Sequence, residues 1–378
     1  MPWKKVTVMS QKEQFIEHYV KGDYGKFSHL CREFGISRKT GYKWVNRVHS
    51  FGTAGLKEAN RRPKNSPSKT TQEIQELILN TRNLFPNWGG EKLRSYLISK
   101  GYRDLPNEKT ISRILKRHGL ITLEESEKHK PWKRFEHENP NDLWQMDFKG
   151  HFATLDGRCH PLTLLDDHSR FCLLIRSCCD EKNQTVQEAL ITVFREYGLP
   201  LRMTMDNGPP WGYSGVQNHT TLTAWLIRIG IIVSHSRPNH PQTQGKLERF
   251  HRTLKLELLS RYQFSDLAQA QEGFDWYKHL YNEIRPHASL MGEVPSSRYC
   301  RSERNYPEDL KPIVYDEKLI VRKVQQGGLI SFKGKEYRIG GAFYGHPVGL
   351  KEGEEEDLFD VYFCHQKIVK IDIKYPAS

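Results

Sequence analysis

The feature that most constrains the fold is a change of sequence pattern near residue 141. Before it, apolar residues recur at the three- and four-residue spacing of helices, and after it short apolar runs alternate with helical segments. The charge changes at the same place, because residues 1–140 contain 28 Lys and Arg against 15 Asp and Glu, whereas residues 141–378 contain 30 of each. A basic arm on a neutral body indicates a nucleic-acid-binding part attached to a second activity, although a merely soluble basic domain would show the same charge.

Residues 11–48 have the pattern of a helix-turn-helix. The stretch FSHLCREFGISRKTGYKWVNRV has one apolar helical face, a turn at Gly35-Ile36, and Ser37 as the N-cap of a basic helix. The apolar face and the turn would suit any small helical bundle, but the basic second helix favours insertion into the major groove of DNA. We therefore expect DNA contacts from Arg38, Lys39, Lys43 and Arg47.

A second helical unit covers residues 71–119 and is a second helix-turn-helix candidate. In its last helix, apolar residues at 111, 114 and 115 are expected to face inward, so that Arg113, Lys116 and Arg117 face outward to DNA. Segments without an apolar period flank this unit and are predicted linkers. In the first of them, Arg61 and Arg62 are expected to follow a groove or phosphate track.

Beyond residue 141 the chain alternates between strands and helices. Three apolar runs within residues 142–179 and two more at 201–206 and 231–236 predict strands, and helices are predicted between and after them, the last within 265–284. This order predicts an α/β domain with a mixed sheet, and short β runs in the tail predict a small all-β barrel or sandwich. The expected domains are 1–60 and 71–120 (both helical), 141–300 (α/β) and 301–378 (all-β), with linkers at 61–70 and 121–140.

Three carboxylates have positions that suggest chemistry. Asp147 lies inside an apolar strand, Asp206 ends another strand before the turn Asn207-Gly208, and Glu248 begins the helix after the last strand of the domain. An aspartate in an apolar strand costs free energy unless a cation or hydrogen bonds compensate its charge. Such hard oxygen ligands are the ones that Mg²⁺ prefers, and two Mg²⁺ ions can catalyse phosphodiester displacement.

The blocks around these residues resemble a known family. WQMDFKG, LLDDHSRF, MDNGPP, HPQTQGKLERFHRTLK and YNEIRPHASL are similar to the Asp-Asp-Glu core of retroviral integrases and of bacterial insertion-sequence transposases. Here 58 residues separate Asp147 from Asp206 and 41 separate Asp206 from Glu248. The second interval is somewhat longer than the family's, and we place the extra residues in 209–220. Because Cys31 is the only cysteine before residue 159, the retroviral His-His-Cys-Cys zinc module is missing and a bacterial transposase fits better.

The resemblance implies the expected activity and partners. It implies a ribonuclease H-like catalytic domain in which Asp147, Asp206 and Glu248 hold two Mg²⁺ ions, with Mn²⁺ able to substitute and no small-molecule cofactor. It also implies that the protein binds the ends of its element, cleaves them and joins the freed 3′-hydroxyls to target DNA, as a homo-oligomer on double-stranded DNA. We expect a bacterial cytoplasmic, nucleoid-associated protein without membrane association, and seven scattered cysteines agree with reduced thiols.

The helix that begins near Glu248 is predicted to have two faces. At 100° per residue, Arg252 and Lys255 lie on the side of Glu248, while leucines at 247, 254 and 258 form a neighbouring apolar side that packs on the sheet. A solvated Glu248–Arg252 pair would give the same spacing. The resemblance assigns Arg252 and Lys255 to the DNA backbone, and Lys246 is expected to contact DNA with them.

Other interpretations stay open. Asp166 and Asp167 could replace one of the ligands, although a structural role behind the site is favoured. His235, His240 and His251 surround Glu248, but their irregular spacing does not favour zinc. Two rival functions are a DNA-binding regulator that keeps the fold without the chemistry, and a ribonuclease H-type nuclease without strand transfer.

Overall fold

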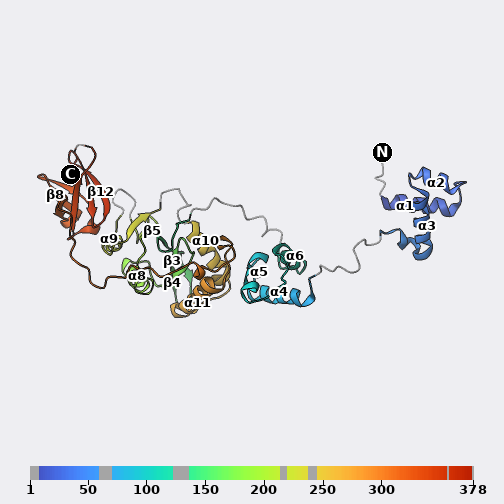
Figure 1. The fold of residues 1–378 in the computed structure, drawn as a ribbon, viewed down its shortest axis with the longest axis horizontal. Coiled ribbons are helices and arrows are strands. Elements are labelled where there is room, and N and C mark those ends of the chain that lie inside the picture. Colours follow the sequence, from blue (N-terminus) through green and yellow to red (C-terminus); the bar gives the residue numbers. More distant parts are fainter. Residues whose placement is uncertain are drawn as a thin grey trace. The chain divides into compact units, whose positions relative to one another are not determined.

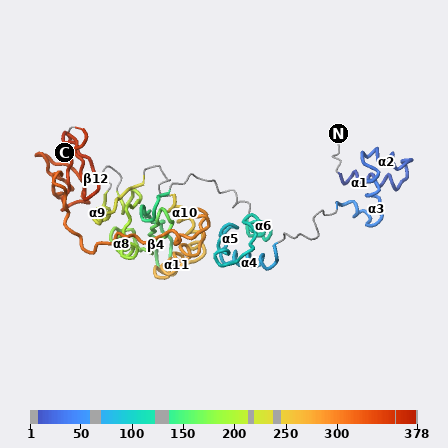
Figure 2. The backbone as a smooth tube through the Cα atoms, in the orientation of Figure 1, coloured from blue at the N-terminus to red at the C-terminus, as the bar shows by residue number. Residues whose placement is uncertain are grey.

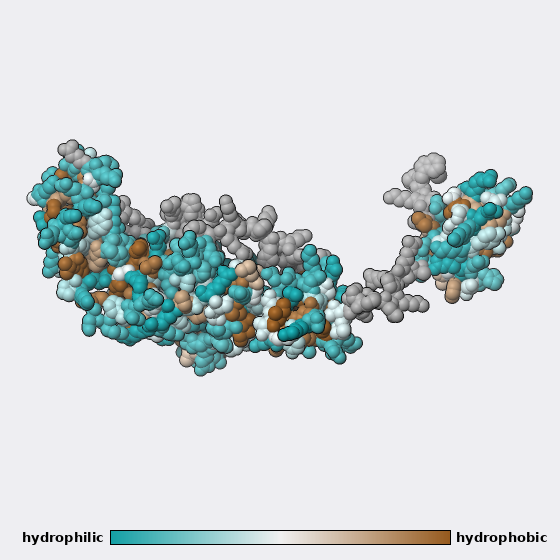
Figure 3. All heavy atoms as spheres, viewed as in Figure 1, coloured by the Kyte–Doolittle hydropathy of each residue, from teal (hydrophilic) through white to brown (hydrophobic). Residues whose placement is uncertain are grey.

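The computed structural model describes residues 8–58, 70–121, 136–212, 219–236, 245–355 and 357–376. The chain divides into two compact units, Met1–Lys69 and Thr70–Ser378 (Figure 1, Figure 2). Arg61, Arg62 and His240 lie outside the described residues. Within the described ranges, no helix combines the length and the apolar character that a membrane span requires. Hydrophilic residues cover most of the face drawn in Figure 3, and hydrophobic ones form separate patches on it.

The first unit is a helical bundle. Within residues 8–58 the helices are α1 (Val8–Lys21), α2 (Phe27–Glu33) and α3 (Arg38–Phe51), followed by a 3-10 turn (Gly52–Leu56). Phe15, Leu30 and Cys31 form its core. Ser37 caps α3 as predicted, since the backbone N–H of Thr40 donates to its Oγ at 3.2 Å. The predicted helix-turn-helix region is therefore confirmed.

The second helical region belongs to the larger unit. It consists of α4 (Gln72–Leu84), α5 (Gly90–Ser99) and α6 (Glu108–Arg117). Ile111, Ile114 and Leu115 are fully buried, as predicted. Their apolar cluster continues through Trp88 into residues of the α/β domain, and the Asn87 side chain donates to the carbonyl of Leu256 at 2.9 Å. This region is thus packed on the α/β domain, which the sequence pattern does not reveal.

The α/β domain has a mixed sheet, as predicted. Within the described residues the strands are β1 (Leu143–Phe148), β2 (Phe152–Ala153), β3 (Arg158–Asp166), β4 (Cys172–Cys178), β5 (Arg202–Met205) and β6 (Ile232–His235). The order is β2-β3-β1-β5-β6, with β4 pairing with β3. The pairs β1–β3 and β3–β4 are antiparallel, whereas β1–β5 and β5–β6 are parallel. One helix precedes β5 and another precedes β6, as the crossover connections between parallel strands require.

Helices cover both faces of this sheet. Trp144, Met146 and Phe148 of β1 pack with α8 (Asn183–Tyr197) and α9 (Thr221–Arg228). The opposite face contacts α10 (Gly245–Leu254) and α11 (Leu267–His279), whose Leu247 and Phe274 join one cluster with Leu165 of β3. Because side chains alternate along a strand, the intervening residues of β1 face α10.

A π-helical turn follows each of the last two helices, Lys255–Leu259 after α10 and Leu280–Ile284 after α11. Leu247, Leu254 and Leu258 are buried, so the predicted apolar face is confirmed. The continuous α-helix assumed for Lys255 is wrong, because the π turn inserts there and changes the angular spacing of later residues. The predicted side shared by Glu248 and Arg252 lies before this turn and is not affected by it.

The C-terminal region is the predicted small β domain. A four-stranded antiparallel sheet has the order β12 (Gln366–Asp372), β11 (Leu358–Phe363), β10 (Pro347–Glu352) and β7 (Ile320–Lys323), and β8 (Leu329–Phe332) pairs with β9 (Lys335–Arg338). The sequence pattern missed β10, in which Pro347 and Gly349 obscure the strand signal. At the border with the α/β domain, the Gln366 side chain accepts from the backbone N–H of Val233 at 2.8 Å and donates to its carbonyl at 2.9 Å.

Candidate active site

Asp147 and Asp206 are placed side by side by strand register. On the parallel neighbours β1 and β5, Gln145 pairs with Thr204, and each aspartate follows two residues later. The two residues therefore reach the same level of the sheet on adjacent strands, whose usual spacing is about 4.8 Å. Asp147 is half-buried and Asp206 is exposed.

The charge on Asp147 is poorly compensated. Burial of the side chain, and then the negative charge of Asp206, raise the pKa of Asp147 to about 7. A hydrogen bond from the backbone N–H of Phe148 opposes this rise, while Glu181 and Glu248 add smaller contributions that increase it. Three other carboxylates thus raise the pKa of Asp147, and this concentration of negative charge attracts a cation.

Asp206 is fixed at the carboxyl edge of the sheet by its neighbours. Its Oδ1 accepts from the backbone N–H of Asn207 at 2.8 Å and from Ser236 Oγ at 3.0 Å. Its carbonyl lies 3.0 Å from Nδ1 of His235. Since Ser236 and His235 stand at the end of β6, the turn after β5 is held to the next strand.

Glu248 is exposed in the first turn of α10, directly after residues 237–244, which lie outside the described residues. One turn later, His251 Nε2 lies 2.7 Å from Thr163 Oγ1, and this hydroxyl donates to the carbonyl of Asp147 at 2.9 Å. Burial, assisted by the charge of Lys149, lowers the pKa of His251 to about 4, so the ring is neutral. A polar link therefore joins the helix of Glu248 to the strand of Asp147.

The trio fits a divalent cation in charge and in ligand chemistry, because all three donors are carboxylates in a region of negative potential. In the described ranges, however, no three His, Cys, Asp or Glu side chains are close enough together to hold a metal ion. A metal bound by all three residues would require the three carboxylates to come closer together. The histidines considered for zinc have other contacts, His235 with Asp206 and His251 with Thr163.

Models of known families match most of the chain in consecutive pieces. An integrase core domain model matches residues 137–241 and a second integrase core model matches 229–295. The C-terminal domain of IS481-family transposases matches 319–377, while a helix-turn-helix model and a homeodomain-like model match 11–64 and 40–115. In its domains the chain is therefore similar to insertion-sequence transposases with an integrase core.

Several relatives of this chain come from bacterial insertion elements. A protein of IS476 from Xanthomonas euvesicatoria is 30% identical over 166 residues, which cover 44% of this chain and 46% of that protein. A protein of IS407 from Burkholderia multivorans is 26% identical and covers 42% of this chain and 54% of its own length, so the chain spans about half the length of these two relatives. The transposase for IS904 from Lactococcus lactis is 24% identical, covering 61% of this chain and 95% of that protein. The HTLV-2 integrase catalytic core domain, solved in complex with magnesium, is 17% identical over 43% of this chain and 97% of that chain, with a TM-score of 0.33.

The basic residues expected to contact DNA differ in their surroundings. The exposed ones are Arg38, Lys39 and Lys43 on α3, Arg113, Lys116 and Arg117 on α6, and Arg252 and Lys255 around the end of α10. Arg47 is half-buried, with its guanidinium carbon 5.2 Å from the centre of the Trp44 ring. Lys246 is also half-buried and forms an ion pair with Asp167. This pair makes Lys246 a weaker candidate for DNA than the others.

Two acidic features were missed or left open by the sequence pattern. Glu181 lies after β4 in no recognisable motif, although its charge acts on Asp147. Asp166 and Asp167 are fully buried. Asp166 accepts from the backbone N–H groups of Asn141 and Ser169, both at 2.8 Å, and therefore closes the turn after β3. These contacts support the structural role that was favoured for the two residues.

Proposed function

We propose that the chain is an active DNA transposase that cleaves the ends of its element and joins them to target DNA. The observation that carries the proposal is the placement of Asp147 and Asp206 at one level of adjacent parallel strands, with Glu248 on the helix linked to the same strand. The matches to integrase core domains give this arrangement its most direct chemical interpretation. The magnesium in the solved retroviral core domain agrees with the proposed cofactor.

In the proposed mechanism, Asp147, Asp206 and Glu248 hold two Mg²⁺ ions. When bound, such ions activate the attacking oxygen and stabilise the leaving oxygen. In the first reaction water forms a bond to phosphorus and the bond to the 3′-oxygen breaks, which frees a 3′-hydroxyl. In the second, that 3′-oxygen attacks a phosphorus of the target and displaces another 3′-oxygen, so that one phosphodiester replaces another without an external energy source.

The other residues of the chain would bind and orient the DNA. Exposed cations of α3 and α6 are proposed to engage the element ends, with α3 in the major groove and phosphate contacts fixing the register. Arg252 and Lys255 are proposed to hold the backbone near the acidic trio. His251, neutral and bonded to Thr163, would keep the first turns of α10 oriented towards β1. Assembly of more than one copy on double-stranded DNA is part of the same proposal.

The test is a cleavage and joining assay with Mg²⁺ on DNA that carries the sequences flanking the gene. The wild-type protein should produce 3′-hydroxyl ends and joined products, and Asp147→Asn should produce neither while still binding DNA. Asp309→Asn, which changes an exposed carboxylate far along the sequence from the trio, is the matched control and should behave as the wild type. Binding without cleavage by the wild type would indicate a regulator, and cleavage without joining would indicate a nuclease.

A further inference from the structure

Asp167 is a buried carboxylate that contacts two of the elements that bear the proposed metal ligands. Its side chain is 2% exposed, and it follows the last residue of β3. Gln145 Nε2 donates to its Oδ1 at 2.9 Å, and Lys246 Nζ donates to its Oδ2. Gln145 precedes Asp147 by two residues on β1, and Lys246 precedes Glu248 by two residues on α10. Asp167 therefore bridges the strand of one proposed ligand and the helix of another.

The contacts of Asp167 are those of a fully engaged internal ion pair. Lys246 Nζ also donates to the backbone carbonyl of Asp167 at 3.2 Å, and the backbone N–H of His137 donates to Oδ2 at 3.0 Å. The Lys246 side chain is only 17% exposed. An ionised carboxylate removed from water is costly unless such donors compensate it, so loss of the lysine would leave an unpaired buried charge.

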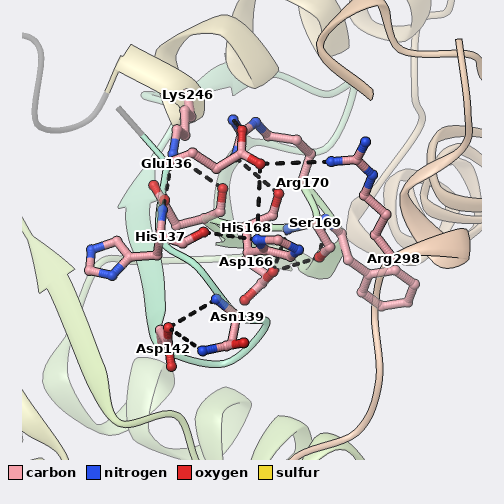
Figure 4. Close-up of polar contacts among 12 residues, drawn as sticks. Glu136, His137, Asn139, Asp142, Asp166, His168, Ser169, Arg170, Lys246 and Arg298 are labelled. Atoms are coloured by element: carbon pink, nitrogen blue, oxygen red, sulfur yellow. Dashed lines mark hydrogen bonds and ion pairs between the residues drawn. The ribbon is translucent and has the colours of Figure 1, made fainter. Parts of the chain in front are cut away.

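Other charged side chains lie close enough to act on Lys246, among them Glu136 and Arg170 (Figure 4). Arg170 donates to Glu136 at 2.8 Å, and Arg298 lies 3.8 Å from the same carboxylate. His168 Nδ1 lies 2.8 Å from the carbonyl of His137, the residue whose N–H binds Asp167. The segment that begins at Glu136 is thus fastened to the turn after β3, and this limits how far Asp167 can shift.

Two anchors therefore flank Glu248 on the same helix. The Lys246–Asp167 pair lies two residues before it, and the His251–Thr163 contact lies three residues after it. Both anchors end on β3 or on the turn that follows it. Together they restrict rotation and sliding of the first turns of α10 over the sheet.

We propose that Asp167 and Lys246 are positioning residues, whose ion pair holds the start of α10 so that Glu248 is presented towards Asp147 and Asp206. This inference rests on the proposed function, because it assumes that Glu248 acts with the two aspartates. It also replaces the expectation that Lys246 serves mainly as a DNA contact. A phosphate contact and an internal anchor predict opposite kinetic results.

The experiment compares Lys246→Met, Lys246→Arg and Asp167→Asn in the full-length protein, with Lys318→Met, an exposed lysine, as the matched control. Lys246→Met should lower the single-turnover cleavage rate about 10- to 100-fold and raise the Mg²⁺ concentration for half-maximal cleavage, as loss of residues that orient metal ligands does. The KM for DNA and the salt dependence of DNA binding should not change. Lys246→Arg should restore part of the rate, and Lys246→Met combined with Asp167→Asn should be no slower than the worse single variant, because the two residues act as one pair.

A raised KM with a salt slope lowered by about one unit and a normal rate would identify Lys246 as a phosphate contact and overturn the proposal. A lower melting temperature with a normal rate and a normal Mg²⁺ requirement would show that the pair has only a structural role, and would also overturn the proposal.

Hydrogen exchange of the backbone amides of residues 245–254 is a second test, which does not depend on activity. Lys246→Met should accelerate this exchange, and Lys246→Arg should accelerate it less. Unchanged exchange would refute the anchor even in a protein that does not cleave DNA, so this outcome is separate from failure of the proposed function. Should Asp167→Asn not fold, the two lysine variants carry the test.

Discussion

The helices α3 and α10 are both short and basic, yet their first turns present opposite charges to their surroundings. On α3, Arg38, Lys39 and Lys43 are exposed, and the buried Trp44 beneath them has the Lys43 ammonium 4.7 Å from its ring centre. On α10, the first lysine is paired internally with Asp167, and the exposed charged residue of the first turn is Glu248. The comparison teaches that composition does not decide which charge a helix offers to DNA or metal. The groups packed under the helix decide it.

The strongest test of this contrast is Glu248→Gln. If the exposed carboxylate of α10 is a metal ligand, the neutral amide should reduce cleavage and joining by roughly 10³-fold, the loss expected when a few kcal/mol of transition-state stabilisation disappear. DNA binding should remain. Lys39→Gln on α3 is the contrasting variant, which should weaken binding but leave the rate at saturating DNA unchanged. Single-turnover assays at saturating DNA compare the two variants. Equal losses of rate in Glu248→Gln and Lys39→Gln would contradict the proposed difference between the two helices.

Removal of Met1–Lys69 tests the role of α3 as the reader of sequence. The fragment Thr70–Ser378 should fold, because it forms a compact unit by its own contacts. It should lose the preference for true element ends over scrambled DNA, which amounts to about 10³-fold or more for specific binders. Competition binding at two salt concentrations measures this preference. A fragment that keeps it would move recognition to α6 or to the β domain.

The pH dependence of the free energy of unfolding tests whether burial and the neighbouring carboxylates destabilise the charged form of Asp147. Because the pKa of Asp147 is raised from 3.8 to about 7, its contribution to stability is fully present below pH 3.8 and is lost as the pH rises to 7. Asp147→Asn should therefore stabilise the metal-free protein by roughly 2 kcal/mol at pH 8, allowing for the partial exposure of the side chain, and have almost no effect near pH 4. Thermal unfolding in EDTA measures both. If Asp147→Asn destabilised the protein at pH 8, the charge of Asp147 would not be unfavourable in the folded protein, and the prediction would be wrong.

The smallest expected effects come from single cations at the far end of α10. Arg252→Ala and Lys255→Ala should each lower the slope of log affinity against log salt by about one unit, because each removes one phosphate contact. Titrations of the fragment Thr70–Ser378 at several salt concentrations provide the slopes. A slope like that of the wild type would show that these side chains belong to a solvated face, and Lys318→Met is the control for general loss of charge.

Local sequence patterns predicted the helices and most of the strands, but they could not predict contacts between segments that are distant in the sequence. The buried leucines of α10, the cap at Ser37 and the inward face of α6 follow from spacing that one helix contains. The pair of Lys246 with Asp167 joins residues 79 positions apart, and Glu181 affects Asp147 only because the sheet brings them together. The π turn at Lys255 and the packing of α4–α6 on the α/β domain likewise depend on neighbours that periodicity does not encode.

The contact of Gln366 with Val233 has a consequence for assembly. β6 is the last strand in the sheet order, and the edge of a sheet normally offers unpaired backbone groups to other chains. The side-chain amide of Gln366 forms the two hydrogen bonds that a neighbouring strand would form, one with the N–H and one with the carbonyl of Val233. Another chain could add to this edge at Val233 only after the β domain had released it. Addition of a strand from a second chain is therefore blocked at this point of the edge.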